Sequence, residues 1–189
     1  MTKKEVRKVV KQSILDGKTK QETFETLKET AKLPTEDLAK IIQSIPSLQA
    51  RQKYKTLNMI LIGLLSLTVL FKMMAGIPII IENGIKWFPV LFILPIINIL
   101  LLIGVATYSQ SSHKWVAIFT ILGLLRSLSD ILGQPFEPLI IIDLTIAAGL
   151  IGLGFYLNSK LCPDYLTVKE RYQNNQGQDR LRNVIKFND

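Results

Sequence analysis

Three charged residues within the apolar part of the chain have the types and spacing that could do chemistry. Arg126 and Asp130 lie four residues apart and so share one face of a helix, and Asp143 follows after a turn. A charged side chain at the bilayer centre costs from roughly 2.5 to above 10 kcal/mol, depending on the method, and less toward the interface. We therefore expect these side chains to pair inside a helical bundle as an intramembrane polar cluster.

This polar cluster has a structural and a functional interpretation. As a structural feature, Arg126 pairs with the carboxylates and sets how two helices pack. As a functional feature, the cluster serves an ion or proton pathway, or Arg126 binds an anion. The structural interpretation is favoured because the opposite charges can form a closed ion pair and lie near the membrane interface. Intramembrane catalysis would need Asp130 and Asp143 to act as a carboxylate pair, which ignores Arg126.

Other chemistry is poorly represented in the chain. It has no Walker A loop and no G-x-G-x-x-G, G-x-S-x-G or H-E-x-x-H motif. His113 stands in a polar stretch without ligands at metal spacing, so we expect it to be solvated. Cys162 is the one cysteine, which excludes a disulfide scaffold and predicts a bare thiol. We expect no catalytic residue, no metal, no cofactor and no enzyme.

The elements that must position the polar cluster follow from a strong segregation of charge. Residues 1–55 hold thirteen Lys/Arg and seven Asp/Glu, whereas residues 57–157 hold four of each kind. A middle section so poor in charge is typical of membrane helices and excludes a compact soluble enzyme with one core. The chain has no signal peptide pattern, so the first span is expected to act as its own insertion signal.

Four apolar stretches predict four transmembrane helices, at about 57–75, 88–106, 115–132 and 139–157, because about 20 residues cross a hydrocarbon core of roughly 30 Å. Gly76 and Pro78 are expected to end the first span, and Pro95 to kink the second. Lys72, close to the far end of the first span, is expected to extend toward the interface. The expected helix-packing residues are Asn98, which can hydrogen-bond across helices, and Ala148 with Gly152, whose spacing lets two helices approach closely.

The first 46 residues predict a small three-helix segment. Gly17 is suited to end the first helix, and Thr19 with Glu22 has the spacing of a capping box for the second. Thr35 is expected to cap the third helix. The resulting fold class is an all-α polytopic membrane protein with a cytoplasmic amphipathic segment (1–46), a transmembrane bundle (47–157) and a cytoplasmic polar tail (158–189), in which residues 173–178 are expected to be disordered or an exposed loop.

The basic excess of both ends predicts the topology. It places both termini in the cytoplasm, with the connections at 76–87 and 133–138 outside, and it suits an integral protein of the plasma (inner) membrane. The alternative is that the third apolar segment, weakened by its charges, is a re-entrant partner of the fourth. Nucleic acid is not expected as a partner, because the acidic residues of the N-terminal segment would oppose phosphate.

Two functions of different classes remain open. The first is a membrane-embedded interaction or accessory subunit, of scaffold or regulatory type, whose partners are the lipid bilayer and, through residues 1–46, another protein or a second copy of the chain. The alternative is a small transporter or channel subunit that uses Arg126, Asp130 and Asp143. The first two spans offer few polar residues for a pore, which favours the first function.

Overall fold

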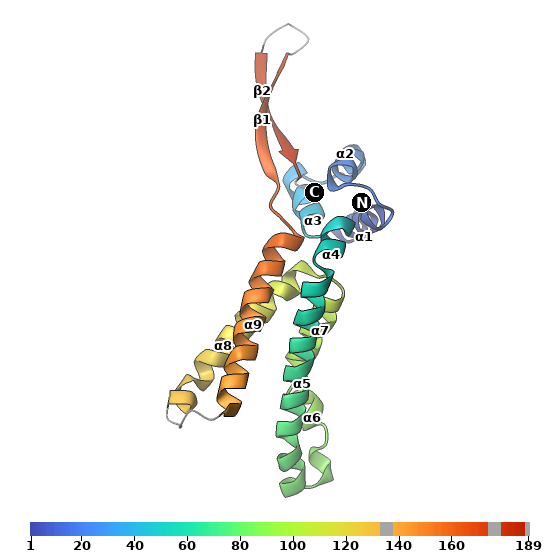
Figure 1. The fold of residues 1–189 in the computed structure, drawn as a ribbon. Coiled ribbons are helices and arrows are strands. Elements are labelled where there is room, and N and C mark those ends of the chain that lie inside the picture. Colours follow the sequence, from blue (N-terminus) through green and yellow to red (C-terminus); the bar gives the residue numbers. More distant parts are fainter. Residues whose placement is uncertain (133–137, 174–178, 188–189) are drawn as a thin grey trace. The chain divides into compact units, whose positions relative to one another are not determined.

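The computed structural model describes residues 1–132, 138–173 and 179–187, and these residues are mostly helical, as the sequence predicts. The chain forms two compact units (Figure 1). The first, the terminal unit, combines Met1–Gln52 with Lys160–Asp189, and the second, the helical unit, is Lys53–Ser159. The sequence predicts separate segments at the two ends of the chain, whereas the structure brings them into one unit.

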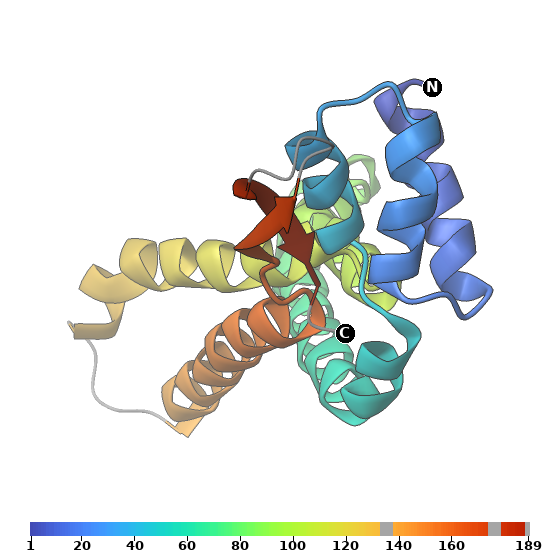
Figure 2. The ribbon, with the colours of Figure 1, turned by 90° about the horizontal axis from the view of Figure 1, so that it is seen from above.

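The terminal unit begins with three helices, α1 (Lys3–Leu15), α2 (Lys20–Thr30) and α3 (Thr35–Gln43), of which α1 and α2 lie side by side (Figure 2). Thr19 and Glu22 form the predicted capping box, because the Glu22 N–H donates to Thr19 Oγ1 and the Thr19 N–H donates to the Glu22 carboxylate. The expectation that Thr35 caps α3 is wrong. Thr35 is the first helical residue, and Pro34 occupies the cap position without a side-chain hydrogen bond.

A β-hairpin near the C-terminus completes the terminal unit. Strand β1 (Leu166–Gln173) pairs antiparallel with β2 (Asp179–Lys186), with Leu166 opposite Lys186. The sequence predicts no regular element here, because charged side chains interrupt the apolar alternation that identifies a strand. Of the loop expected at residues 173–178, Gln173 ends β1 and residues 174–178 lie outside the described part of the chain.

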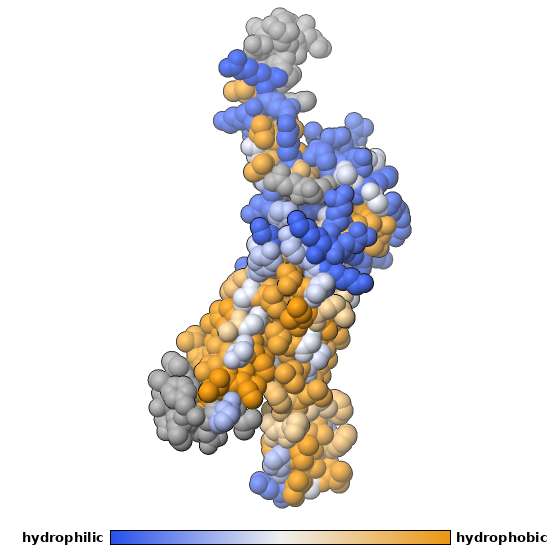
Figure 3. Space-filling view, viewed as in Figure 1, coloured by the Kyte–Doolittle hydropathy of each residue, from blue (hydrophilic) through white to orange (hydrophobic). Residues whose placement is uncertain are grey.

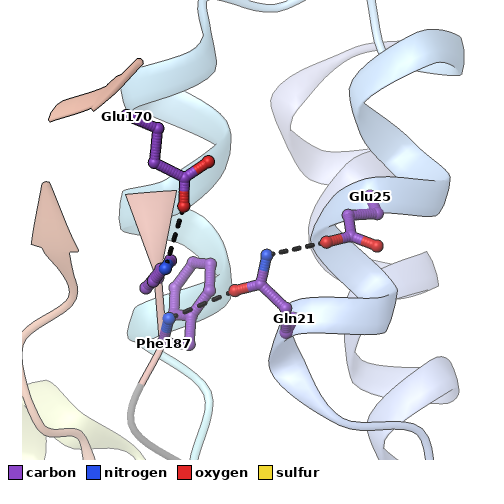
Figure 4. A network of polar contacts seen from close by, with 5 residues as sticks. Gln21, Glu25, Glu170 and Phe187 are labelled. Carbon is purple, nitrogen blue, oxygen red and sulfur yellow. Dashed lines mark hydrogen bonds and ion pairs between the residues drawn. The ribbon is translucent and has the colours of Figure 1, made fainter. Parts of the chain in front are cut away.

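The hairpin belongs to the same core as the N-terminal helices. Ile185 is buried in one cluster with residues of α1, α2 and α3, and Phe187 packs edge-on against Phe24 with ring centroids 5.6 Å apart. Gln21 joins the two parts further, since its amide donates to Glu25 and its oxygen accepts from the Phe187 N–H (Figure 4). Long-range pairs of this kind leave no local pattern in a sequence, so the shared core was not predicted.

The helical unit consists of α5 (Lys55–Asn83), the short turns η1 (Ile85–Trp87) and α6 (Val90–Ile93), α7 (Ile96–Ala106), α8 (Gln110–Leu132) and most of α9 (Pro138–Leu161). The helix α4 (Leu48–Lys53) precedes it, and the Ala50 N–H donates to Ser47 Oγ at its start. Apolar residues cover much of the outer surface of the helical unit (Figure 3).

Among the described residues, two helices are long and apolar enough to cross a membrane, α5 and the stretch Ile140–Leu161 of α9. The pair Ile85–Ile93 and Ile96–Ala106 would add a third span. These are two or three candidates and not clearly the four that the sequence predicts. α8 is long enough, but polar residues stand at both of its ends, from Gln110 to Lys114 and from Arg126 onward.

The prolines of the first two apolar stretches have different effects on their helices. The expected end of the first span at Gly76 and Pro78 is wrong, because α5 continues through Pro78 to Asn83. Gly76 is buried there, and a Cβ on it would lie 3.0 Å from Leu91 Cδ2, so this glycine serves close packing and does not end the helix. The predicted kink at Pro95 is confirmed, since the two parts of the second stretch are bent by 41°.

Candidate functional site

The helical unit holds a cavity of about 520 Å³ between residues of α5, α7, α8 and α9. Most of its lining is apolar, and its polar lining residues are Thr68, Lys72, Asn98, Thr120, Arg126, Ser127 and Asp143. The volume lies in the range of small-ligand sites, which have mainly apolar walls and a few polar groups. The cavity is therefore the candidate site of this protein.

The structure places two members of the predicted polar cluster on this one cavity. Arg126 comes from α8 and Asp143 from α9, and both side chains are exposed. Among the described residues, no ion pair joins Arg126 to Asp143. Asp130 lies in α8, but its side chain is outside the described part of the structure. Arg126 and Asp143 thus line one cavity without an ion pair between them, and the expected pairing of Arg126 with Asp130 lies outside the described residues.

A hydrogen-bonded group from α5 and α7 adds to the cavity. Lys72 Nζ donates to Asn98 Oδ1 at 2.8 Å, and Asn98 Nδ2 donates to Thr68 Oγ1 at 3.3 Å. Asn98 therefore bonds across helices and also holds the lysine at the cavity wall. An ammonium group has three N–H donors, and among the described residues Lys72 uses one of them, so two can reach a bound ligand.

Lys72 is not among the site residues that the sequence predicts. It was expected near the end of a span, where a lysine extends toward the interface. One signal was available in the sequence. Ile85 lies in the connection between two antiparallel helices, and Lys72 precedes it by as many residues as Asn98 follows it. A helical hairpin that turns at Ile85 brings such residues to the same level.

A second polar group lies in the helical unit, away from the cavity lining. His113 is fully buried in α8, with Nδ1 2.8 Å from the Ser109 carbonyl oxygen and Nε2 2.8 Å from Asn58 Oδ1. Asn58 Nδ2 also donates to the Val105 carbonyl at 3.3 Å. The expectation of a solvated His113 in a loop is wrong, because α8 already begins at Gln110 and buries the ring against α5.

The other predicted packing residues do not contact the rest of the unit closely. Ala148 and Gly152 are both exposed, and a Cβ on Gly152 would meet no atom within 4 Å. The close approaches occur at neighbouring glycines: a Cβ on Gly149 would lie 3.0 Å from Leu64 Cδ1, and one on Gly154 would lie 2.9 Å from the His113 carbonyl oxygen. Helical periodicity correctly identified α9 as a helix with close contacts, but it did not identify the face of α9 that makes these contacts within the chain.

The charges of the cavity limit the chemistry it can perform. Its described lining carries two cationic side chains, Lys72 and Arg126, against one carboxylate, Asp143. Nothing in the described residues groups three His, Cys, Asp or Glu side chains as a metal site requires. The site can thus bind an anionic group by charge and hydrogen bonds while its apolar walls receive a hydrocarbon part.

Comparison of the chain with protein-family models, with curated proteins and with solved structures found no match.

Proposed function

We propose that this protein binds an amphiphilic anion in the cavity of its helical unit and acts as a small membrane transporter or channel subunit. The observation that carries the proposal is the position of Lys72 and Arg126 on one cavity with mainly apolar walls. Charged side chains that face hydrocarbon are costly, so an occupant that offers them charge and hydrogen bonds is favoured over lipid tails.

The proposal includes four membrane crossings with both termini in the cytoplasm, in the plasma (inner) membrane. Residues 1–52 and 160–189 belong to one folded unit, which supports placing both ends of the helical unit on the same side of the membrane. This requires an even number of crossings. If α5, the bent second stretch and α9 all cross, α8 must cross too. The basic excess of the termini supports the cytoplasm as their side.

Two soluble surfactants of equal chain length test the site by the sign of their charge. Decanesulfonate is a permanent anion, and decyltrimethylammonium is a permanent cation. In mild detergent, we expect decanesulfonate to raise the melting temperature of the full chain, since a ligand that binds the folded state at a hundred times its Kd stabilises it by about 2.7 kcal/mol. The cation should give no comparable rise.

Variants show whether the cavity is responsible. Lys72→Met combined with Arg126→Met should abolish the rise, whereas Lys86→Met, which removes an exposed lysine outside the cavity lining, should preserve it. An equal rise with both surfactants, or in the double variant, would contradict the proposal. Transport is then measured as entry of decanesulfonate into proteoliposomes, and binding without entry would restrict the function to binding.

The interaction or accessory subunit remains a second candidate function. The observation that favours it is the folded terminal unit, which shares one core between both ends of the chain and exposes many charged residues. Affinity purification of the full chain in mild detergent tests it. A stoichiometric partner that is lost when surface charges of this unit are neutralised, but kept in Lys72→Met with Arg126→Met, would support it.

A further inference from the structure

One face of α1 carries a regular row of lysines. Val6, Val10 and Ile14 are buried in the core of the terminal unit, so the opposite face of α1 is turned outward. Lys4, Lys8 and Lys11 are all exposed, and their spacing of four and three residues places them on one stripe of this outer face. Leu15 continues the stripe and is 44% exposed. We call these four residues the α1 lysine stripe.

The acidic groups near the stripe are already engaged by neighbours. The Glu5 carboxylate accepts the Thr2 N–H at 2.8 Å, and Asp16 accepts the Gln12 amide at 2.8 Å. Asp37 forms an ion pair with Lys3 at 2.8 Å, and this lysine lowers the pKa of the Asp37 carboxyl. Within the described part of the chain, no ion pair involves the three lysines of the stripe.

The neighbouring helix has the opposite character. Glu22, Glu25 and Glu29 are exposed on one stripe of α2. The α1 lysine stripe attracts an anionic surface, whereas the glutamates of α2 oppose phosphate, so a nucleic acid that wraps around the unit would meet both kinds of charge.

On the proposed membrane location, the connection to the helical unit keeps the terminal unit next to an anionic surface, the bilayer. α4 ends at Lys53 and α5 begins at Lys55, so on the proposed membrane location the terminal unit stays beside the bilayer at high effective concentration. Each lysine near an anionic bilayer favours binding by about fivefold, and an exposed leucine among lysines is typical of interfacial helices.

We propose that the α1 lysine stripe binds the anionic headgroups of the bilayer that holds the protein. This proposal rests on the membrane location in the proposed function and is independent of the cavity.

The test uses the full chain in lipid nanodiscs with a fluorophore at Lys18→Cys, an exposed position just beyond the stripe, and a nitroxide quencher on a fraction of the headgroups. Discs contain phosphatidylcholine alone or mixed with phosphatidylglycerol. We expect strong quenching in the mixed discs that falls at high salt. The triple variant Lys4→Gln, Lys8→Gln, Lys11→Gln should lower the ratio of bound to free terminal unit by on the order of a hundredfold.

A matched control removes the same charge elsewhere in the terminal unit. Lys28→Gln, Lys32→Gln and Lys40→Gln change three exposed lysines and should retain the quenching. Quenching that does not depend on phosphatidylglycerol, or that is lost equally in both triple variants, would overturn the proposed binding of headgroups by the α1 lysine stripe. Contact between fluorophores on two copies in phosphatidylcholine would identify a second copy as the occupant instead. Failure of every variant to enter bilayers would reject the membrane location itself, whereas the cavity is tested separately in detergent.

Discussion

At the scale of single residues, burial changes what a side chain can do. Asn58 and His113 are polar residues that the structure buries completely and joins through a 2.8 Å contact, so they stabilise the packing of α5 and α8 and are not free for a ligand. Lys72 shows the reverse, because a residue expected at the interface lies on the cavity wall beside Asn98. The type of residue alone did not distinguish these roles.

Cys162 gives a prediction at this scale. Burial raises the pKa of its thiol to about 11, against the opposing effect of Lys20 and Arg51. The thiolate is the reactive form, so at pH 8 Cys162 should react with a disulfide reagent about a hundredfold more slowly in the folded chain than after unfolding. A cysteine introduced at the exposed Lys18 position provides the control. Equal rates at the two positions would contradict the burial of Cys162.

The same shift fixes the sign of a pH effect on stability. The folded state holds the Cys162 proton up to about pH 11, while an ordinary thiol ionises near pH 9. Its contribution to the free energy of unfolding is therefore fully present below about pH 9 and is lost as the pH rises toward 11.

At the scale of elements, close packing rests on a few glycines. Gly154 brings α9 against α8, since a Cβ there would lie 2.9 Å from the His113 carbonyl oxygen and 3.2 Å from Ala117 Cβ. A Cβ on Gly104 would overlap the Ser112 side chain, so the end of α7 also lies close to α8. Gly152 stands on an exposed face of α9 and has no such neighbour.

A pair of substitutions tests this difference. Gly154→Ala should lower the free energy of unfolding by about 1–3 kcal/mol, because its methyl group forces α8 and α9 apart. Gly152→Ala adds the same methyl group in open space and should leave stability unchanged or raise it by up to about 1 kcal/mol, because alanine favours a helix over glycine. Thermal unfolding of both variants in detergent measures the effect. Equal melting temperatures for the two variants would refute the contact between α9 and His113.

At the scale of the whole molecule, the shared core of the two termini constrains topology independently of charge. Ile185 and Phe187 pack with the N-terminal helices, so residues before α5 and after α9 must lie on one side of any membrane that the helical unit crosses. The positive-inside rule leads to the same pairing of the ends through a separate physical effect.

Labelling of intact cells with an impermeant maleimide tests the topology. Lys28 and Lys169 are exposed residues of the terminal unit, and Asn83 is exposed at the end of α5. We expect Asn83→Cys to react in intact cells, and Lys28→Cys and Lys169→Cys to react after permeabilisation alone. Opposite behaviour of the cysteines at 28 and 169 would reject the shared terminal unit, and reaction of both in intact cells would reverse the orientation.

The sequence by itself determined the local features of this protein. Apolar runs predicted the helical middle, the capping box at Thr19 and Glu22 was readable from its spacing, and Pro95 predicted a kink. Arg126 and Asp143 were recognised because charges in apolar helices are rare. Each of these effects arises within a few residues of the chain or from composition, so one sequence contains the information.

Tertiary structure alone decided which distant residues meet. It placed Lys72 beside Asn98, left Arg126 and Asp143 on an open cavity, and buried His113. It also folded the C-terminal hairpin onto the N-terminal helices. Such contacts depend on helix rotation and on side chains far apart in the chain, and exchanging one helix face for another changes neither composition nor periodicity. The energy that selects among these arrangements comes from packing and from paired polar groups, which exist only once the chain is folded.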